Sequence, residues 1–126
     1  MTLATYTTAD ISKQLDVPKH IITYLCNRGL VPHIKRTRLG YRTFNQEQVN
    51  LIEMLLKMRQ AGFSSAELRQ YSRLYRQGDS TAEERLAMLT THKHQLQQEI
   101  KERQQAIDFI ERQEELPRQK SEESAE

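Results

Sequence analysis

The stretch RTRLGYRTFN, residues 36–45, gathers three arginines and a tyrosine around one glycine. The surrounding residues 31–44 alternate weakly between apolar and polar side chains, as short strands do. Gly40 tolerates the positive φ that a tight hairpin turn requires. The stretch therefore predicts a small basic hairpin, and the rest of the chain has to explain what such a hairpin is for.

Helix signals occupy most of the remaining sequence and recur in one form. An aromatic residue precedes a polar N-cap, and an apolar residue follows at the fourth helical position, so the two apolar groups can pack across the first turn. Phe44, Asn45 and Val49 follow this pattern. With glycines placed where helices can end, these signals predict helices over residues 8–15, 18–28, 46–61, 65–76 and 81–116. The expected fold class is mainly α.

The first two predicted helices are short, and only a couple of residues around Asp16 and Val17 join them, as in a helix-turn-helix. At about 100° per residue, the second helix divides into two faces. Its apolar face consists of Pro18, Ile21, Ile22 and Leu25, and its polar face of Lys19, His20, Thr23, Tyr24 and Asn27.

A basic hairpin directly after such a motif predicts a winged helix-turn-helix. In that architecture the second helix enters the major groove of double-stranded DNA, and cations of the hairpin, the wing, lie on flanking phosphates. The wing cations here are Lys35, Arg36, Arg38 and Arg42.

Charge is distributed unevenly along the 126 residues. Residues 1–62 carry nine Lys and Arg against four Asp and Glu, a balance of +5, whereas residues 63–126 carry ten against thirteen, a balance of −3. A DNA-binding N-terminal half accounts for this excess. One cysteine excludes an internal disulfide, and the chain has neither a signal sequence nor an apolar run long enough to cross a membrane. We therefore expect a cytoplasmic protein with no membrane partner.

The last predicted helix, residues 81–116, would be about 54 Å long at 1.5 Å per residue, which is too long for so small a domain to cover. Its apolar residues follow the three- and four-residue spacing of a coiled coil, so a lone helix would leave an apolar stripe in water. The stripe consists of Leu86, Leu89, Leu96, Ile100, Ile107 and Ile110, interrupted by Lys93, Arg103 and Glu114. A homodimer buries two such stripes by two-fold symmetry and fixes the separation of two DNA-binding units.

The sequence also predicts where the parts of the chain end. Pro117 should terminate the long helix, and the polar residues after it should not fold. The expected organisation is a winged helix-turn-helix domain at 1–78, a dimerisation helix at 79–116 and a disordered tail at 117–126.

Three fragments in order, TYLCNRGLVP, GYRTF and MRQAGFSSAEL, followed by the long helix, resemble the MerR family of bacterial transcription regulators. The resemblance covers residues 6–116, and GDSTAEERL is most similar to the branch that responds to aldehydes and thiol-reactive compounds. The resemblance implies an antiparallel dimer that binds a palindromic operator in an over-long promoter spacer. Such a regulator distorts the duplex so that RNA polymerase engages both promoter elements.

The resemblance also implies roles for particular residues. Tyr24, Tyr41 and Arg42 match family positions that contact DNA, whereas Thr23 and Cys26 stand where the family has an arginine and an acid, and Leu25 stands where it has a second tyrosine. Lys19 and His20, one turn earlier, can compensate for the missing arginine. The family's second wing, formed by the third and fourth helices, carries two further candidates. The predicted DNA-binding residues are Lys19, His20, Thr23, Tyr24, Arg36, Arg38, Tyr41, Arg42, Lys57 and Arg59.

The sequence offers few groups that could sense an effector. His92 and His94 lie about 200° apart around a helix, so they cannot share one metal ion, and no cofactor site is expected. The position of the sensing thiol in the aldehyde-responsive branch is Lys57 here. Cys26 is the one thiol: it is either a packing residue or an electrophile sensor beside the recognition helix.

Two classes of function compete. The first is a dimeric transcription regulator, and the alternative is an architectural or recombination-accessory protein that bends DNA without controlling polymerase. The long dimer helix favours the regulator. An enzyme is not expected, because the sequence has no glycine-rich phosphate loop and no arrangement of nucleophile, base and orienting group.

Overall fold

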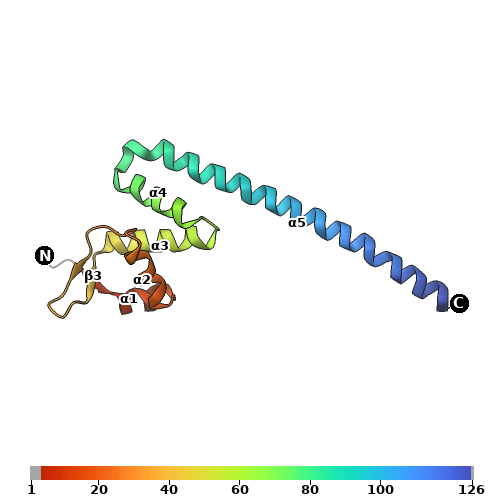
Figure 1. Ribbon diagram of the computed structural model, residues 1–126, viewed down its shortest axis with the longest axis horizontal. Coiled ribbons are helices and arrows are strands. Elements are labelled where there is room, and N and C mark those ends of the chain that lie inside the picture. Colours follow the sequence, from red (N-terminus) through yellow and green to blue (C-terminus); the bar gives the residue numbers. More distant parts are fainter. Residues whose placement is uncertain (1–3, 126) are drawn as a thin grey trace. The chain divides into compact units, whose positions relative to one another are not determined.

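A computed structural model describes residues 4–125 and confirms a mainly helical protein with a winged helix-turn-helix and a long C-terminal helix (Figure 1). The three-stranded sheet is small, and two of its strands form the wing. In chain order the elements are β1 Tyr6–Thr7, α1 Thr8–Leu15, α2 Lys19–Asn27, β2 Lys35–Arg36, β3 Arg42–Phe44, α3 Gln46–Gln60, α4 Ser65–Arg76, the 3₁₀ turn η1 Gly78–Thr81 and α5 Ala82–Ala125.

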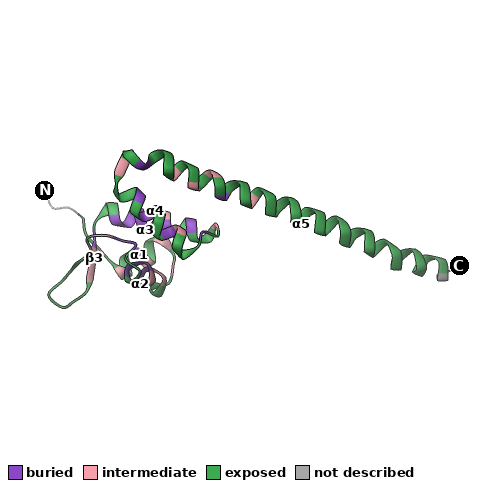
Figure 2. Cartoon of the chain, turned by 45° about the horizontal axis from the view of Figure 1, so that its top comes forward, coloured by how far each residue is buried: buried purple, intermediate pink, exposed green. Residues whose placement is uncertain are grey.

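The chain divides into two units, the first ending at Arg85 and the second beginning at Leu86. The first unit therefore extends past the domain expected at 1–78 and also includes the rest of η1 and the first turn of α5. Buried residues concentrate in this unit, as the purple segments of Figure 2 show. The largest fully buried apolar side chains are Ile11, Ile22, Leu25, Leu30, Phe44, Ile52, Leu55 and Leu68.

Side-chain caps begin three of the helices. Thr7, Asn45 and Ser64 each accept a hydrogen bond from the backbone N–H three residues later, and the side chain of that later residue bonds back to the cap. Such reciprocal caps satisfy backbone donors that a helix start otherwise leaves open. They set the beginnings of α1, α3 and α4 within a residue of the expected positions.

A tight turn joins α1 to α2. Asp16 closes α1 in the left-handed region at φ 53°, and the Ser12 hydroxyl donates a 2.5 Å hydrogen bond to the carbonyl oxygen of Val17. Pro18 is the N-cap of α2, where its missing N–H costs nothing. This turn fixes the angle at which α2 leaves α1.

The wing belongs to a sheet with the strand order β1-β3-β2, in which both pairs are antiparallel. Lys35 lies opposite Thr43, and Arg36 lies opposite Arg42. Strand β1, which the sequence did not reveal as a strand, pairs Tyr6 with Phe44. Because β1 runs directly into α1, the base of the wing is attached to the helix-turn-helix.

Buried polar contacts hold the loop before the wing. The Ser72 hydroxyl of α4 donates to the carbonyl oxygen of Leu30 at 2.6 Å, and the Gln48 amide of α3 donates to the carbonyl oxygen of Pro32 at 2.8 Å. The loop from α2 to β2 is thus fixed to both later helices, so the wing has a defined origin.

The prediction that Pro117 ends the long helix was wrong, since α5 continues to Ala125 with Pro117 inside it, and residues 117–125 are helical. Proline removes one backbone donor, which here leaves the carbonyl of Gln113 without its helical partner. The flanking residues are good helix formers, and Arg118 forms ion pairs with Glu114 at 3.7 Å and Glu115 at 3.4 Å across the proline.

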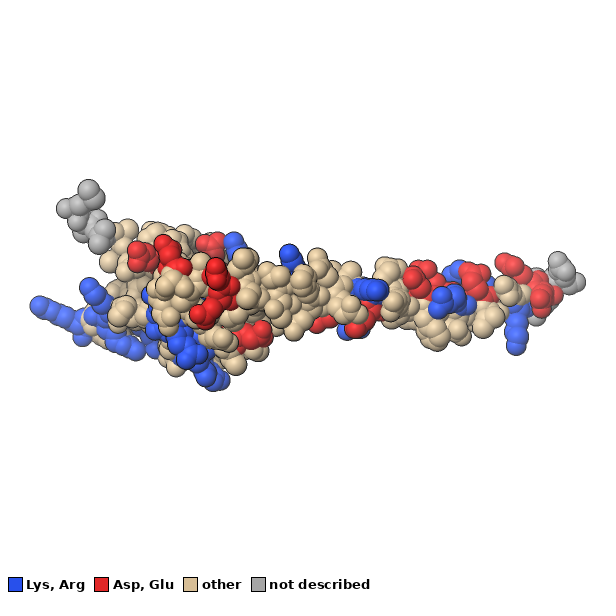
Figure 3. Space-filling view, turned by 90° about the horizontal axis from the view of Figure 1, so that it is seen from above, with Lys and Arg blue, Asp and Glu red and all other residues tan. Residues whose placement is uncertain are grey.

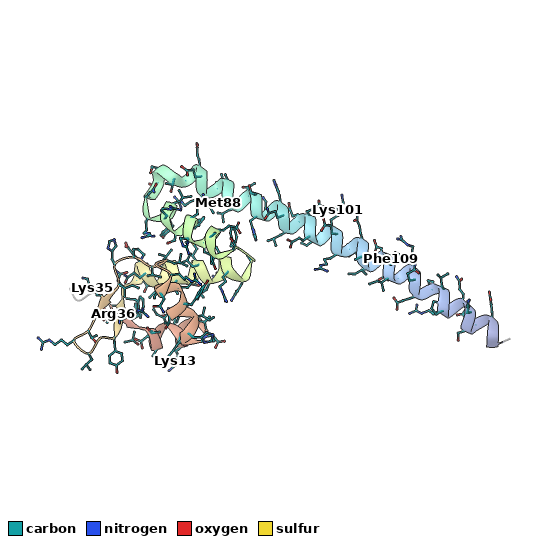
Figure 4. The ribbon with its side chains drawn as sticks, in the orientation of Figure 1. Lys13, Lys35, Arg36, Met88, Lys101 and Phe109 are labelled. Atoms are coloured by element: carbon teal, nitrogen blue, oxygen red, sulfur yellow. The ribbon has the colours of Figure 1, made fainter. Side chains whose placement is uncertain are left out.

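Apolar side chains of α5 are largely exposed in the single chain. The residues of the predicted stripe that are exposed are Leu86, Leu89, Ile100, Ile107 and Ile110, and Leu96 is half-buried. Two exposed apolar residues, Phe109 and Leu116, lie off that stripe (Figure 4 labels Phe109). Over the described residues, no helix is both long and apolar enough for a membrane crossing.

Candidate nucleic-acid interface

Helix α2 buries a slightly different face from the predicted one. Ile22, Leu25 and Cys26 are buried, whereas Ile21 is half-buried and Pro18 is exposed. Pro18 was wrongly assigned to the apolar face, because as the N-cap it precedes the first turn and does not share the helical periodicity. The burial of Cys26 completes an i, i+3, i+4 stripe.

The opposite side of α2 offers polar groups to a ligand. Lys19, His20 and Asn27 are exposed, and Thr23 and Tyr24 are half-buried. This is the division expected of a helix that packs on its own domain with one face and reads a partner with the other.

The wing ends in a compact turn from Thr37 to Tyr41. The N–H of Thr37 donates to the carbonyl oxygen of Tyr41 at 2.8 Å, and the N–H of Gly40 donates back to that of Thr37 at 2.9 Å. Gly40 has φ 87°, so it supplies the left-handed conformation expected of it. The N–H of Tyr41 also donates to the Thr37 hydroxyl at 3.2 Å. These bonds define the conformation of the tip.

The wing arginines have unequal surroundings. The Arg36 guanidinium donates to the carbonyl oxygen of Gly40 at 2.7 Å and so braces the turn. Arg42 donates to the side-chain oxygen of Asn27 at 2.6 Å, which joins the wing to the last turn of α2. Arg38 is exposed at the tip. Figure 4 shows Lys35 and Arg36 on strand β2.

Tyr24 connects α2 to the third and fourth helices. Its hydroxyl lies 2.7 Å from that of Ser65 in the first turn of α4. The guanidinium carbons of Arg28 and Arg59 lie 5.2 and 5.9 Å from the centre of its ring, within cation–π range. The hydrogen bond to Ser65, followed by the charges of Arg28, Arg59 and Arg69, lowers the pKa of Tyr24.

Four elements therefore contribute polar or basic groups in or beside α2, and we call Tyr24, Arg28, Arg42, Arg59 and Arg69 together the basic surface. Arg42 comes from the wing, Arg28 from the end of α2, and the other two arginines from α3 and α4. In Figure 3 Lys and Arg gather along one edge of the N-terminal unit, and the red acidic side chains lie mainly away from it. Clustered guanidinium groups of this kind attract phosphate.

The two candidates on α3 differ. Arg59 lies over Tyr24 and so belongs to the basic surface, whereas Lys57 forms an i, i+4 ion pair with Glu53 at 3.2 Å. Sequence reasoning missed Arg28, Ser65 and Arg69. Arg28 follows the last turn of α2, and the other two lie 37 or more positions further on, so only the fold brings them to Tyr24.

Cys26 lies on the buried side of α2. Burial raises the pKa of its thiol, and the nearby charges of Arg42 and Arg36 oppose that rise only in part. Thiolates are the reactive form of cysteine, so this setting disfavours reaction with electrophiles. Within the described residues, no group of three or more His, Cys, Asp or Glu side chains could hold a metal ion.

Two family models match the chain, and together they cover both units. Residues 6–74 match the model described as MerR HTH family regulatory protein, and residues 49–113 match the model described as MerR, DNA binding. The chain belongs to the MerR family. The matched segments are those that the two models describe as a helix-turn-helix regulatory protein and as a DNA-binding region.

Relatives and solved structures agree with this assignment. The HTH-type transcriptional regulator AdhR of Bacillus subtilis is 33% identical over 88 residues, which are 70% of this chain but only 63% of AdhR. A MerR family regulator of Listeria monocytogenes is 31% identical, with a TM-score of 0.71 and coverage of 84% of this chain and 80% of that one.

A third structure adds evidence for the fold. HiNmlR, described as a MerR family regulator lacking the sensor domain and bound to promoter DNA, has a TM-score of 0.70 at 24% identity and covers 83% of this chain and 80% of its own. At that identity the likeness supports the shared fold alone.

Proposed function

We propose that this MerR-family chain acts as a homodimer that binds a palindromic operator through α2 and the wing of each protomer. One observation carries the proposal: cations from three other elements lie beside α2, since Arg42 of the wing bonds to Asn27 in its last turn and the arginines of α3 and α4 act on its Tyr24. A duplex lying on the basic surface would meet a helix for its major groove and cations for the adjacent phosphates.

Individual contacts follow from exposure and position. Lys19, His20 and Thr23 lie on the polar side of α2 and are proposed to face bases or nearby phosphates. Tyr41 and Arg42 are proposed to contact the backbone from the wing, Arg38 to contact DNA from the tip of the wing, and Arg59 to contact the backbone from the second wing. Lys57 is a weaker candidate because Glu53 neutralises it, and Arg36 contributes mainly by bracing the turn.

Dimerisation is proposed to use the apolar stripe of α5. Its exposed leucines and isoleucines have no cover in the single chain, and pairing them antiparallel removes them from water. Two-fold symmetry would then present two basic surfaces to the two halves of a palindrome.

The dimer is proposed to act in the cytoplasm. At a promoter, it is proposed to distort the over-long spacer so that RNA polymerase engages both promoter elements. Support for this step comes from membership of the family and from the resemblance described above. A response to aldehydes or other electrophiles is likewise proposed from the resemblance alone. The residues themselves add no support, because Lys57 occupies the position of the family's sensing thiol and Cys26 is buried.

Footprinting on the DNA that flanks the chain's own gene tests the central proposal. We expect a protected palindrome between two promoter elements, and loss of protection when one half of the palindrome is scrambled. In vitro transcription should depend on the protein at the native spacer and become independent of it once the spacer is shortened to ordinary length. Protection and bending of DNA without any effect on transcription would instead identify an architectural protein.

A further inference from the structure

The tip of the wing carries an apolar side chain that nothing in the fold requires. Leu39 is 84% exposed, and the Thr37–Tyr41 turn is held by backbone groups and the Thr37 hydroxyl without it. Such turn positions usually hold small or polar residues, which bond to the local backbone. A single exposed leucine is unremarkable on a protein surface. This one lies between Arg38 and Gly40 at the end of a hairpin that adjoins the proposed DNA-binding helix.

We propose that Arg38 and Leu39 together enter the minor groove beside each half-site and select A·T base pairs there. The inference rests on the proposed function, since it assumes that α2 occupies the neighbouring major groove. The minor groove is about 6 Å wide, which admits a hairpin tip but not a helix.

The chemistry of the two side chains matches one kind of groove floor. An A·T pair presents only hydrogen-bond acceptors in the minor groove, whereas a G·C pair adds the guanine 2-amino donor. Arg38 has donors and no acceptor, and the Leu39 side chain has neither. The tip could therefore donate to an A·T floor but would leave the guanine amino group buried without a partner, which is unfavourable. Narrow A·T-rich grooves also attract arginine through their stronger negative potential.

The rigidity of the tip supports a defined insertion. Arg36 donates to the carbonyl oxygen of Gly40 at 2.7 Å, and Arg42 is bonded to Asn27 of α2 at 2.6 Å. The first bond braces the turn, and the second relates the wing to the recognition helix. Contact by a preorganised tip costs less conformational entropy than contact by a loose loop.

The first test locates the tip directly. An iron–EDTA group attached to a Leu39→Cys variant, in a Cys26→Ala background, releases hydroxyl radicals next to the bound DNA. Cleavage maxima on the two strands should be offset in the 3′ direction, the pattern of a radical source in the minor groove. The same group on a Lys19→Cys variant of α2 should give the opposite, major-groove offset. A major-groove offset from the wing tip, or no cleavage there, would overturn the proposal.

The second test measures the selection. Operators are compared that carry A·T, G·C or inosine·C pairs at the sites cleaved from position 39, because inosine·C has the major-groove face of G·C without the 2-amino group. We expect A·T and inosine·C to bind about tenfold more tightly than G·C. In the Leu39→Asn variant, whose amide oxygen can accept from guanine, the difference should fall to about twofold.

Equal wild-type affinity for the three operators, or full discrimination by Leu39→Asn, would contradict the proposed role of the tip. Arg59→Ala, at a proposed backbone contact outside the wing, separates this failure from failure of the proposed function, since it should weaken binding to all three duplexes by the same factor. If the wild-type protein bound none of the three operators more tightly than it binds a scrambled duplex, the proposed function itself would be refuted.

Discussion

Isoleucines behave differently in the two units of this chain. Ile52 in α3 is 0% exposed, whereas Ile100 in α5 is 69% exposed. The first unit encloses its apolar residues between helices and a small sheet, and the second presents them along one helix. The same residue type thus stabilises a core in one unit and, in the proposed dimer, packs against a partner in the other, so the stability of α5 should depend on concentration while that of the first unit should not.

The comparison predicts unequal effects for one substitution made in both units. Ile52→Ala should reduce the free energy of unfolding of the first unit by about 3 kcal/mol, because it removes fully buried methyl and methylene groups and leaves a cavity. Ile107→Ala, at a half-exposed stripe position, should leave the unfolding of that unit unchanged. Urea denaturation of both variants at several protein concentrations measures this difference.

Only Ile107→Ala should change how the unfolding of α5 depends on protein concentration, since this substitution weakens the dimer and not the core of the first unit. Equal losses from the two substitutions, independent of concentration, would show that the chain folds as one cooperative unit and that the contrast drawn here does not hold.

A charged residue in the apolar stripe of α5 should prevent dimerisation without unfolding the first unit. Ile100→Asp places a carboxylate on each of two facing helices, and its burial should weaken dimerisation at least a hundredfold, about 3 kcal/mol. In the single chain the position is exposed, so the monomer should remain folded. Sedimentation velocity at micromolar concentration should show monomers.

Gln105→Asp serves as the matched control, because residue 105 is exposed and lies on the side of α5 away from the stripe. It adds the same charge and should preserve the dimer. Dimers in Ile100→Asp would place the interface elsewhere, and the off-stripe residues Phe109 and Leu116 would then be the next to test.

In the first unit, removal of one cation should alter DNA binding rather than stability. Arg42→Ala removes a proposed phosphate contact and the hydrogen bond to Asn27. Affinity should fall for all duplexes alike, by about tenfold at moderate salt, and the slope of log affinity against log salt should flatten by about one. Lys57→Ala, where Glu53 already pairs the charge, should change the slope less. A fluorescence anisotropy salt titration decides the assignment, and unchanged affinity and slope in Arg42→Ala would refute it.

Local signals in the sequence account for most of the fold. The caps at Thr7, Asn45 and Ser64 and the glycine at the wing turn act within a few residues, so they can be read without the structure. Pro117 misled the prediction because proline disfavours the interior of a helix without forbidding it, and α5 continues through it to Ala125. Strand β1 escaped notice because two residues carry no periodicity.

The site was predictable only where its residues are close in sequence. The wing and the polar side of α2 could be identified from spacing, but the surroundings of Tyr24 could not. Ser65 lies 41 positions away, and the packing of α4 on the rest of the unit is what brings it to the Tyr24 hydroxyl. The difference between the two cations of α3 likewise depends on their neighbours. Lys57 pairs with Glu53, whereas Arg59 lies over the ring of Tyr24.

The smallest effect is expected at Cys26, which tests whether the first unit contains a sensor as well as a core. Its thiol is buried, and burial raises the pKa, so the thiolate that attacks electrophiles should form only at higher pH than in an unfolded chain. Iodoacetamide at neutral pH should therefore modify Cys26 more slowly in the native protein than in urea, and the native rate should rise as the pH rises toward the elevated pKa.

Cys26→Ala should accordingly change operator affinity by less than about twofold, with a modest loss of stability from the smaller side chain. The decisive comparison is a reporter driven by the native promoter, in cells given formaldehyde or methylglyoxal, with wild type and Cys26→Ala side by side. If the wild type responds and the variant does so equally, any effector acts elsewhere in the chain. A response that disappears in Cys26→Ala, with DNA affinity intact, would make Cys26 a sensor inside the recognition helix. Opening of the α2 packing would then have to precede its reaction, which couples the core of the first unit to its function.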